Sequence, residues 1–361
     1  MYGGRIRGQG TYGCVFQPAL DCDTSDTDPN KVGKITSRVE ARIEIAAADA
    51  LRSIPNAANY VILPEANTCV PKPRNKQKDT NIKECNFVKG KPIEETIQLI
   101  MPWGGYSLSS INIYYREFDL YRFIEEILAA GTFLILHEMC HFDIGGHNIL
   151  FDTNNVPRFI DFGFAFQASK LSKDDLPDYW RKLSTEHDTE TPEITLVLGS
   201  DEGYPIQSLV SDLEKSKPAV RRLASLCDVV PSDWGSDLLD WSLQSKSFQQ
   251  HDWLSCWKLY WPGFDAWAIG TVILEVLELQ MMSPGFTETP QWAKRSSDVK
   301  ELLRSLCHAN PAKRLDAAEA LSMWTKGTHP LIASGIDAVS GLQGNGIGSD
   351  WIQAKRNARP S

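Results

Sequence analysis

The stretch of sequence that decides the fold is HFDIGGHNILFDTNNVPRFIDFG, residues 141–163. Its two apolar segments, HNILFD and PRFIDFG, are separated by the polar residues TNNV, which predicts two short strands joined as a β-hairpin. Asp143 precedes the hairpin, Asn148 lies at its start and Asp161 near its end. Carboxylate and amide oxygens suit Mg²⁺. The joint spacing of these three residues argues against a hairpin with incidental polar side chains.

A glycine-rich pattern, G-x-G-x-x-G-x-V, lies near the N-terminus at Gly8, Gly10, Gly13 and Val15. Glycines let backbone N–H groups approach a phosphate without obstruction by Cβ. By itself the pattern also suits an ordinary turn. A dinucleotide-binding turn needs a helix after the third glycine, whereas the strand-like residues CVF follow here. We therefore expect a strand, a turn and a second strand over residues 5–16.

Lys34 and Glu44 are candidates for a pair that binds phosphate. Lys34 lies on a predicted strand, and Glu44 lies ten residues later on a predicted helix. An ion pair between strand and helix would hold the lysine over phosphate oxygens. Glu40, one helical turn earlier, is the alternative partner. Glu44 is preferred because Leu51 and Pro55 then fall where the helix should pack and stop.

Apolar periodicity and turn residues predict the remaining elements. An apolar strand, IQLIMPW, is expected at 97–103, and the glycines that follow it end the strand. The other expected elements are a short strand at 31–35, polar loops at 19–30 and 71–82, and helices at 38–54, 116–140, 264–279, 297–307 and 316–324.

Composition narrows the classes of function. The 361 residues are 42% hydrophobic and carry a net charge of −9, which argues against nucleic acid as a partner. The N-terminal segment is too polar for a signal peptide. No apolar run approaches the length of a membrane span, and the run from Ile269 contains Glu275 and Glu278. We expect neither nucleic-acid binding nor membrane insertion.

The eight cysteines show no zinc-like spacing. Scattered thiols of this kind are typical of a reducing compartment, so we expect free cysteines and a cytoplasmic protein. The positions concerned are Cys14, Cys22, Cys69, Cys85, Cys140, Cys227, Cys256 and Cys307.

The order of these motifs resembles that of eukaryotic-type protein kinases, over roughly residues 4–332. Three later segments extend the resemblance: Thr191-Pro-Glu193 resembles A-P-E, the segment DAWAIG from Asp265 resembles D-x-W-x-x-G, and NPAKRLDAAEAL at 310–321 resembles a late kinase motif. The resemblance implies a buried ion pair between Glu193 and Arg314. It also implies that Asp265 braces the backbone of the loop that carries Asp143. The opening GGRIRGQGTYGCVF also looks like serine/threonine kinases of large cytoplasmic DNA viruses, which implies a location in host cytoplasm or virion.

The implied fold is α+β and two-lobed, with a small β-rich N-lobe and a larger helical C-lobe. We expect the N-lobe at 1–103 and the C-lobe at 104–332, with a helical insert at about 194–262. A Gly/Ser-rich tail at 333–361 is expected to be mobile.

The resemblance also implies the roles of the site residues. Asp143 would orient a substrate hydroxyl and accept its proton, while Asn148 and Asp161 would hold Mg²⁺ or Mn²⁺. Lys34, paired with Glu44, would bind the phosphates of ATP, which the glycine-rich turn covers. The structural positions of the same motifs are His141, Phe162, Gly163, Glu193, Asp265 and Arg314.

The segment MPWGG at 101–105 would bind adenine. Adenine needs one backbone carbonyl and one backbone N–H, and proline offers only the carbonyl. We therefore expect the carbonyl at Pro102, the donor at or near Gly104, and Met101 at the back of the pocket. This register is open by one residue.

Two residues depart from the kinase pattern on the substrate side. Phe142 stands where many kinases have an arginine that binds a phosphorylated activation loop, so we expect activity without loop phosphorylation. Gly145 stands where serine/threonine kinases have a lysine that stabilises the transferring phosphoryl group. Another basic residue could replace that lysine, and the sequence does not identify it.

About seventy residues separate Glu193 from Asp265, more than kinases usually have. The tryptophans in this insert would either anchor a partner on a surface at 230–262 or form the core of an added helical subdomain. We favour the subdomain. The tryptophans are Trp234, Trp241, Trp253, Trp257 and Trp261.

Three functions remain open. The first is an ATP-dependent protein kinase that phosphorylates a protein substrate, with serine or threonine favoured over tyrosine. The second is a pseudokinase that binds nucleotide as a scaffold, which the two departures motivate. The third is a small-molecule phosphotransferase of the aminoglycoside-kinase type, against which the later motifs argue.

Overall fold

A computed structural model describes residues 4–10, 12–22, 28, 30–77, 80–336 and 343–358. The chain forms two compact units, the first from residues 1–106 and 150–165, the second from 107–149 and 166–361. The fold is mixed α+β, with the main antiparallel sheet in the first unit and most helices in the second.

The first unit departs from the expected domain boundaries because it includes part of the predicted hairpin. Strand β9 (Pro157–Phe159) is tied to an earlier segment of the same unit by backbone hydrogen bonds. Ile62 N donates to Phe159 O at 2.9 Å, and Phe159 N donates to Tyr60 O at 3.0 Å. These bonds join the hairpin to residues expected in a different lobe. The hairpin itself is confirmed, since β8 (Ile149–Phe151) and β9 are neighbours in a three-stranded sheet with β6 (Tyr106–Ser107).

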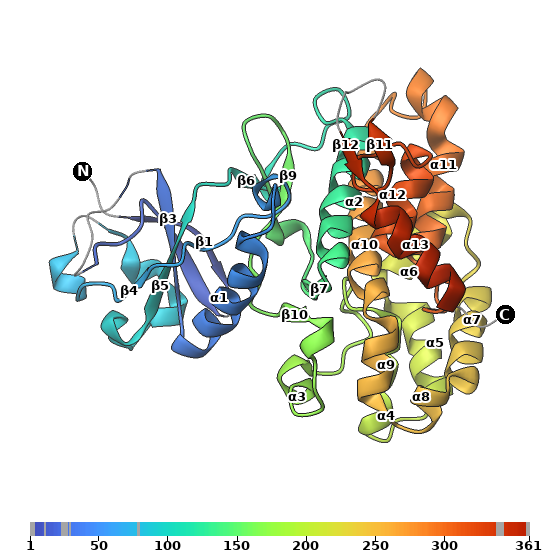
Figure 1. Ribbon diagram of the computed structural model, residues 1–361, viewed down its shortest axis with the longest axis horizontal. Coiled ribbons are helices and arrows are strands. Elements are labelled where there is room, and N and C mark those ends of the chain that lie inside the picture. Colours follow the sequence, from blue (N-terminus) through green and yellow to red (C-terminus); the bar gives the residue numbers. More distant parts are fainter. Residues whose placement is uncertain are drawn as a thin grey trace. The chain divides into compact units, whose positions relative to one another are not determined.

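A five-stranded antiparallel sheet in the order β1–β2–β3–β5–β4 forms the first unit (Figure 1). Lys34 lies on the central strand β3, opposite Val15 on one side and Leu99 on the other. The strands predicted at 5–16, 31–35 and 97–103 are confirmed. The bounds are β1 (Arg5–Gly10), β2 (Gly13–Gln17), β3 (Lys31–Thr36), β4 (Thr68–Cys69) and β5 (Ile97–Pro102).

Helix α1 (Arg38–Arg52) packs against β5. The Ser37 side chain accepts hydrogen bonds from the backbone N–H groups of the first turn and begins the helix. Its buried residues Ala41, Glu44, Ala48 and Leu51 recur every three or four positions and define one face. The prediction of a helix here is confirmed, with an end two residues earlier than expected.

The polar loop expected at 71–82 contains one short 3-10 turn, η2, and a second, η3, begins at its last residue. Within the loops expected at 19–30 and 71–82, residues 23–27, 29, 78 and 79 lie outside the described part of the chain. The turns of the first unit are η1 (Ala57–Asn59), η2 (Arg74–Lys76), η3 (Ile82–Glu84), η4 (Asn86–Val88) and η5 (Ile93–Glu95).

Two disulfides in the first unit contradict the prediction of eight free thiols. Cys14 bonds to Cys85, and Cys22 bonds to Cys69. The first disulfide lies in a buried cluster with Phe16, among other apolar side chains. The partners are 71 and 47 residues apart, so pairing depends on folding and leaves no local spacing pattern. The expectation of a reducing compartment loses its basis. The buried free cysteines are Cys140, Cys227, Cys256 and Cys307.

Helix α10 (Pro262–Met281) lies at the centre of the second unit, where α2 (Leu120–Leu136), α11 (Pro290–Leu306) and α12 (Ala317–Thr325) pack against it (Figure 1). Most of its residues are apolar and buried around the whole helix, as expected of a core helix, while Glu275 and Leu279 near its C-terminal end are exposed. A Cβ at Gly131 of α2 would lie 2.5 Å from Ile269 and 3.0 Å from Ala317. Glycine at this position therefore permits the close approach of the three helices. All four helices were predicted.

The insert forms six further helices, and its tryptophans are buried. Their exposed fractions are 9% or less, so the favoured prediction of a helical subdomain with its own core is confirmed, and these tryptophans do not form the alternative partner surface at 230–262. Trp241 packs on Phe248, and Trp234 packs on Trp267 of α10. The helices are α4 (Pro192–Asp201), α5 (Ile206–Ser216), α6 (Pro218–Cys227), α7 (Pro231–Gln244), α8 (Lys246–Gln249) and α9 (Trp253–Tyr260).

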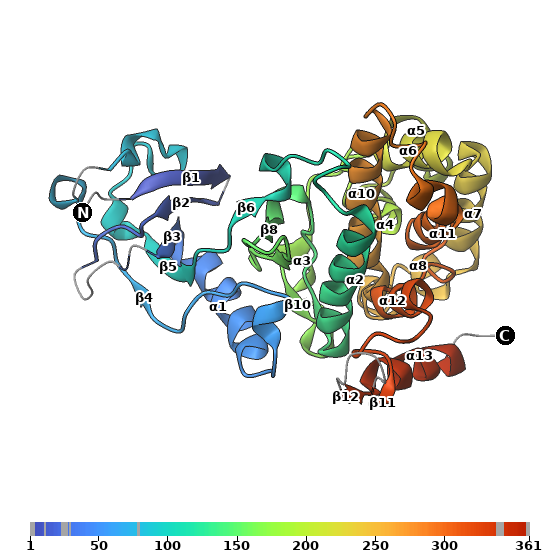
Figure 2. The ribbon, with the colours of Figure 1, turned by 90° about the horizontal axis from the view of Figure 1, so that it is seen from above.

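The tail expected to be mobile contains a helix, α13 (Ile347–Ala358), which packs beside α12 and α2 (Figure 2). Lys355 Nζ forms ion pairs with Asp316 at 2.8 Å and Glu319 at 2.7 Å, and Trp351 Nε1 donates to Asp316 at 2.9 Å. Strands β11 (Ser334–Ile336) and β12 (Gln343–Asn345) precede it, and residues 337–342 and 359–361 of the tail lie outside the described residues. Among the helices that the structure describes, none has the length and apolar content needed to cross a bilayer.

Candidate active site

The first unit brings three predicted site residues together. Lys34 Nζ lies 2.6 Å from Glu44 Oε2 and 2.7 Å from Asp161 Oδ1. β3 supplies the lysine, α1 the glutamate, and the segment after β9 the aspartate. The predicted Lys34–Glu44 pair is confirmed, and no ion pair to the alternative Glu40 occurs among the described residues.

The Lys34 ammonium stays charged although it is buried. Burial alone would lower the pKa of Lys34, but the carboxylates of Glu44 and Asp161 outweigh it and raise the pKa above its usual value. Burial acts on Glu44 in the opposite sense and raises the pKa of that carboxyl. The two carboxylates therefore favour the charged form of Lys34. The Asp161 side chain, 39% exposed, is the part of this trio that faces solvent.

The glycine-rich turn has two glycines that the fold itself does not require. A Cβ at Gly8 or Gly10 would meet no atom within 4 Å, and neither residue has a positive φ. A Cβ at Gly13, in contrast, would lie 2.2 Å from Ile35 O, so packing in the sheet explains this glycine. Open space at Gly8 and Gly10 suits a bound group that approaches the backbone closely. Thr11, within the turn, lies outside the described residues.

The residues predicted to bind adenine lie around one apolar cluster of the first unit. Met101 is buried in this cluster together with Val32 and Leu99, and Val15 packs against it. Pro102 is the last residue of β5 and is exposed. Trp103 N donates to Asn30 O at 3.2 Å, so it is engaged within the unit. Gly104 is therefore the better candidate for the free donor, as the sequence suggested.

The second unit holds Asp143 in a loop between β7 (Met139–Cys140) and the 3-10 turn η7 (Gly146–Asn148). Asn148 Nδ2 donates to Asp143 O at 2.9 Å and to Asp143 Oδ2 at 3.1 Å. Asp265, buried on α10, accepts from His141 N at 2.7 Å and from Phe142 N at 2.9 Å. The predicted brace of this loop by Asp265 is confirmed.

Phe142 adopts a left-handed backbone conformation, with φ of 61°, which is rare for a bulky residue. Its ring packs against Trp257 of α9 at 4.9 Å and against Phe166 and Phe264 at 5.7 Å each. Tyr179 completes this aromatic cluster. The ring contacts and the bonds from Asp265 hold the strained residue in place. Phe166 and Tyr179 belong to the segment that follows Gly163, so the cluster anchors that segment.

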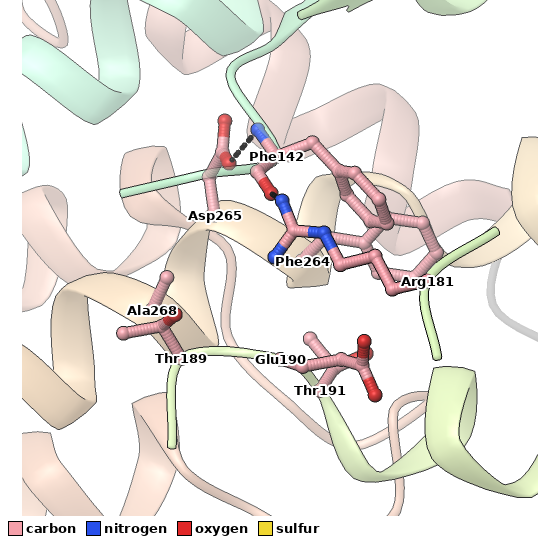
Figure 3. A pocket seen from close by; sticks show the side chains of 8 residues that line it. All are labelled: Phe142, Arg181, Thr189, Glu190, Thr191, Phe264, Asp265 and Ala268. Carbon is pink, nitrogen blue, oxygen red and sulfur yellow. Dashed lines mark hydrogen bonds between the residues drawn. The ribbon is translucent and has the colours of Figure 1, made fainter. Parts of the chain in front are cut away.

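Arg181 is the functional candidate that sequence reasoning missed. Its Nη2 lies 2.9 Å from Asp143 Oδ1 and 2.9 Å from Phe142 O. Figure 3 shows the guanidinium beside the Phe142 ring, at the edge of a small cavity that Glu190 and Thr191 also line. The only signal in the sequence was that basic residues between Gly163 and Glu193 are few: Lys170, Lys173, Arg181 and Lys182.

Gly145 lies on the same loop as Asp143. A Cβ there would lie 2.9 Å from the exposed His147 ring, whose rotation would make room. With glycine at position 145, the loop from His141 to Ile149 contains no lysine or arginine. The positive charge next to Asp143 comes from Arg181 instead.

The predicted ion pair of Glu193 with Arg314 is also confirmed in the second unit. The contact is bidentate, with Nη1–Oε1 at 2.7 Å and Nη2–Oε2 at 2.8 Å. Arg314 also donates to Gly263 O and His308 O. The pair connects the start of α4 to the segment before α12.

The predicted metal ligands belong to different units, Asn148 to the second and Asp161 to the first. Asn148 donates its amide N–H groups to Asp143, which leaves the amide oxygen as a donor atom for a cation. Asp161 offers a partly exposed carboxylate. Within the described residues, no group of three or more His, Cys, Asp or Glu side chains is arranged to hold a metal ion. Mg²⁺ bound with a nucleotide needs few protein ligands, because phosphates and water complete its shell.

No protein-family model matches the sequence, and no curated protein matches it. The functional conclusion therefore rests on the residues and their geometry.

Proposed function

We propose that this chain is an ATP-dependent protein kinase that transfers a phosphoryl group to serine or threonine hydroxyls of a protein substrate. In this proposal the two compact units are the small and large lobes of a kinase-like fold. The observation that carries the proposal is the buried cation of Lys34, held between Glu44 at 2.6 Å and Asp161 at 2.7 Å. A buried lysine with two carboxylates, on the strand paired with the one that follows the glycine-rich turn, suits a polyphosphate and its metal ion.

The proposed roles follow from the contacts. Glu44 fixes the side chain of Lys34, so the ammonium has a defined position for phosphate oxygens. Asp161 and the Asn148 amide oxygen would hold Mg²⁺ or Mn²⁺, which neutralises phosphate charge when bound with ATP. Val15, Met101 and the backbone at Pro102 and Gly104 would receive the adenine.

Asp143 is the proposed base for the hydroxyl. Its Oδ2 accepts from the Asn148 amide and its Oδ1 from Arg181, so the carboxylate has a fixed orientation. The substrate oxygen forms a bond to the γ-phosphorus while the bond from that phosphorus to the β–γ bridging oxygen breaks. The hydroxyl proton passes to Asp143, and ADP leaves with the bridging oxygen.

One experiment separates this function from its alternatives. Purified protein is incubated with labelled Mg-ATP and a panel of acidic and basic model proteins, next to an Asp143→Asn variant. Label on protein serine or threonine, lost in the variant, supports the proposal. ATP binding without transfer supports a nucleotide-binding scaffold. ATP turnover that depends on a small alcohol supports a small-molecule phosphotransferase.

A further inference from the structure

We propose that Arg181 is a positioning residue for phosphoryl transfer, because its guanidinium fixes the Asp143 carboxylate and supplies the cation that the Asp143 loop lacks. The inference rests on the proposed function. Arg181 lies 38 residues after Asp143, and both belong to the second unit.

The first argument is that Arg181 completes the hydrogen bonding of Asp143. Arg181 Nη2 donates to Oδ1 at 2.9 Å, and Asn148 Nδ2 donates to Oδ2 at 3.1 Å. With one donor on each oxygen, the plane of the carboxylate is set. Orientation of this kind lowers the barrier because less reorganisation is needed during reaction.

The second argument is that Arg181 is itself held rigidly. The guanidinium lies 5.2 Å from the centre of the Phe142 ring and donates to Phe142 O at 2.9 Å. Its side chain is only 16% exposed. A guanidinium placed over an aromatic face and bonded to a backbone carbonyl keeps little freedom. Trp257 and Tyr179 buttress the Phe142 ring from other sides.

The third argument is that Arg181 leaves Asp143 accessible. The Asp143 side chain keeps 24% of its surface exposed, so a substrate hydroxyl can reach it. The Arg181 side chain therefore does not cover the Asp143 carboxylate completely. A fixed positive charge beside Asp143 also favours negative charge that develops near this carboxylate during the reaction.

The test is steady-state kinetics on the full chain with four variants. Arg181→Gln removes the charge and keeps much of the shape. Arg181→Lys restores a charge, and Arg181→Ala opens space for added guanidinium ion. Lys182→Gln is the matched control, since Lys182 is the next residue, basic and exposed.

We expect Arg181→Gln to lower kcat about 10²-fold or more, with a KM for ATP within roughly threefold of wild type. Arg181→Lys should recover part of the loss, and guanidinium ion should raise the rate of Arg181→Ala but not of wild type. Lys182→Gln should behave as wild type.

The contrary outcomes are distinct. If wild type transfers no phosphate to protein, the proposed function fails and the inference falls with it. If wild type is active and Arg181→Gln matches the control or exceeds it, the kinase stands and the role of Arg181 is wrong. If Arg181→Gln is inactive but neither lysine nor guanidinium restores activity, Arg181 is only structural. Thermal melting of each variant accompanies the kinetics, and the guanidinium arm decides if Arg181→Gln fails to fold.

Discussion

The Glu193 carboxylate and the Arg314 guanidinium form a bidentate ion pair with side chains that are 1% and 0% exposed. The residues are 121 positions apart, yet both atoms of each fork are matched at 2.7 and 2.8 Å. The pair joins the end of the segment that contains Arg181 to the helices beneath it. Loss of this ion pair should therefore lower the stability of the protein and disturb the segment that holds Arg181 beside Asp143.

We expect Arg314→Met to destabilise the protein by about 3–5 kcal/mol, because removal of one partner leaves a buried charge without compensation. The double variant Arg314→Met/Glu193→Leu should recover much of this loss, since two apolar side chains leave no buried charge. Urea denaturation of the single and double variants measures both values. Equal stability of Arg314→Met and wild type would contradict the prediction.

Glu44→Gln should reduce kcat/KM for ATP about 10- to 100-fold, because Lys34 loses the contact that fixes its side chain. Glu40→Gln is the matched control: Glu40 lies one turn earlier on the same helix, and among the described residues Lys34 forms ion pairs with Glu44 and Asp161 and not with Glu40. ATP titration and initial rates give the comparison. The assignment of Glu44 is wrong if the two variants lose activity equally.

Activity should not depend on phosphorylation of the segment 164–190. The aromatic contacts of Phe166 and Tyr179 with Phe142 and Trp257 already anchor this segment without a phosphate. Phosphatase treatment followed by the transfer assay, with mass spectrometry to verify removal, is the measurement. Loss of activity that a phosphorylated residue within 164–190 restores would refute this expectation.

Reduction of the disulfides should destabilise the first unit. Removal of the Cys14–Cys85 bond, which closes a loop of 71 residues, should cost about 2–5 kcal/mol. Cys14→Ser/Cys85→Ser tests it by urea unfolding, with wild type under reducing conditions beside it.

In denaturant without reductant, a thiol reagent should count four free cysteines. Burial raises the pKa of Cys227 and Cys256 to about 12, so these thiols should be unreactive while the protein is folded. A count of eight would show that neither disulfide forms.

Acid should destabilise the protein as pH falls below about 6.5. Burial lowers the pKa of four histidines. For His187, the positive charges of Arg181 and Lys217 lower the pKa further. The unfolded chain then binds more protons than the folded chain between the folded pKa and about 6.5, so the free energy of unfolding falls as the pH falls through this range. Urea midpoints at about pH 7.5 and 5.5 should therefore differ, and His137→Gln should flatten the profile. Identical midpoints would contradict the prediction. The histidines are His137, His187, His308 and His329.

Local patterns were sufficient for the elements that carry the candidate site. Alternation and glycine turns predicted the strands around Lys34, and helical periodicity predicted α1, α2 and α10. The pairs Lys34–Glu44 and Glu193–Arg314 and the brace by Asp265 followed from motif order. The strands and helices depend on spacing within one element, whereas the Glu193–Arg314 pair and the Asp265 brace join residues 121 to 124 positions apart and were expected only from the resemblance to kinases.

Pairings without a local pattern were decided only by the tertiary structure. The disulfides of Cys14 and Cys22 join distant segments, so scattered cysteines gave no indication of them. The tail helix α13 is held by Lys355 on Asp316 and Glu319, contacts that glycine content cannot predict. The buried tryptophans likewise show their role only once neighbouring helices cover them.

Arg181 illustrates the division most clearly. The sequence by itself determined that the Asp143 loop lacks a lysine or arginine, because that is a matter of residue order. Which distant basic residue stands there instead depended on the path of the segment after Ala165 and on the cluster around Phe142. Arg181 and Asp143 are 38 residues apart, so their salt bridge forms only because the folded chain packs the two segments together. The contacts that favour this packing exist only in the folded state.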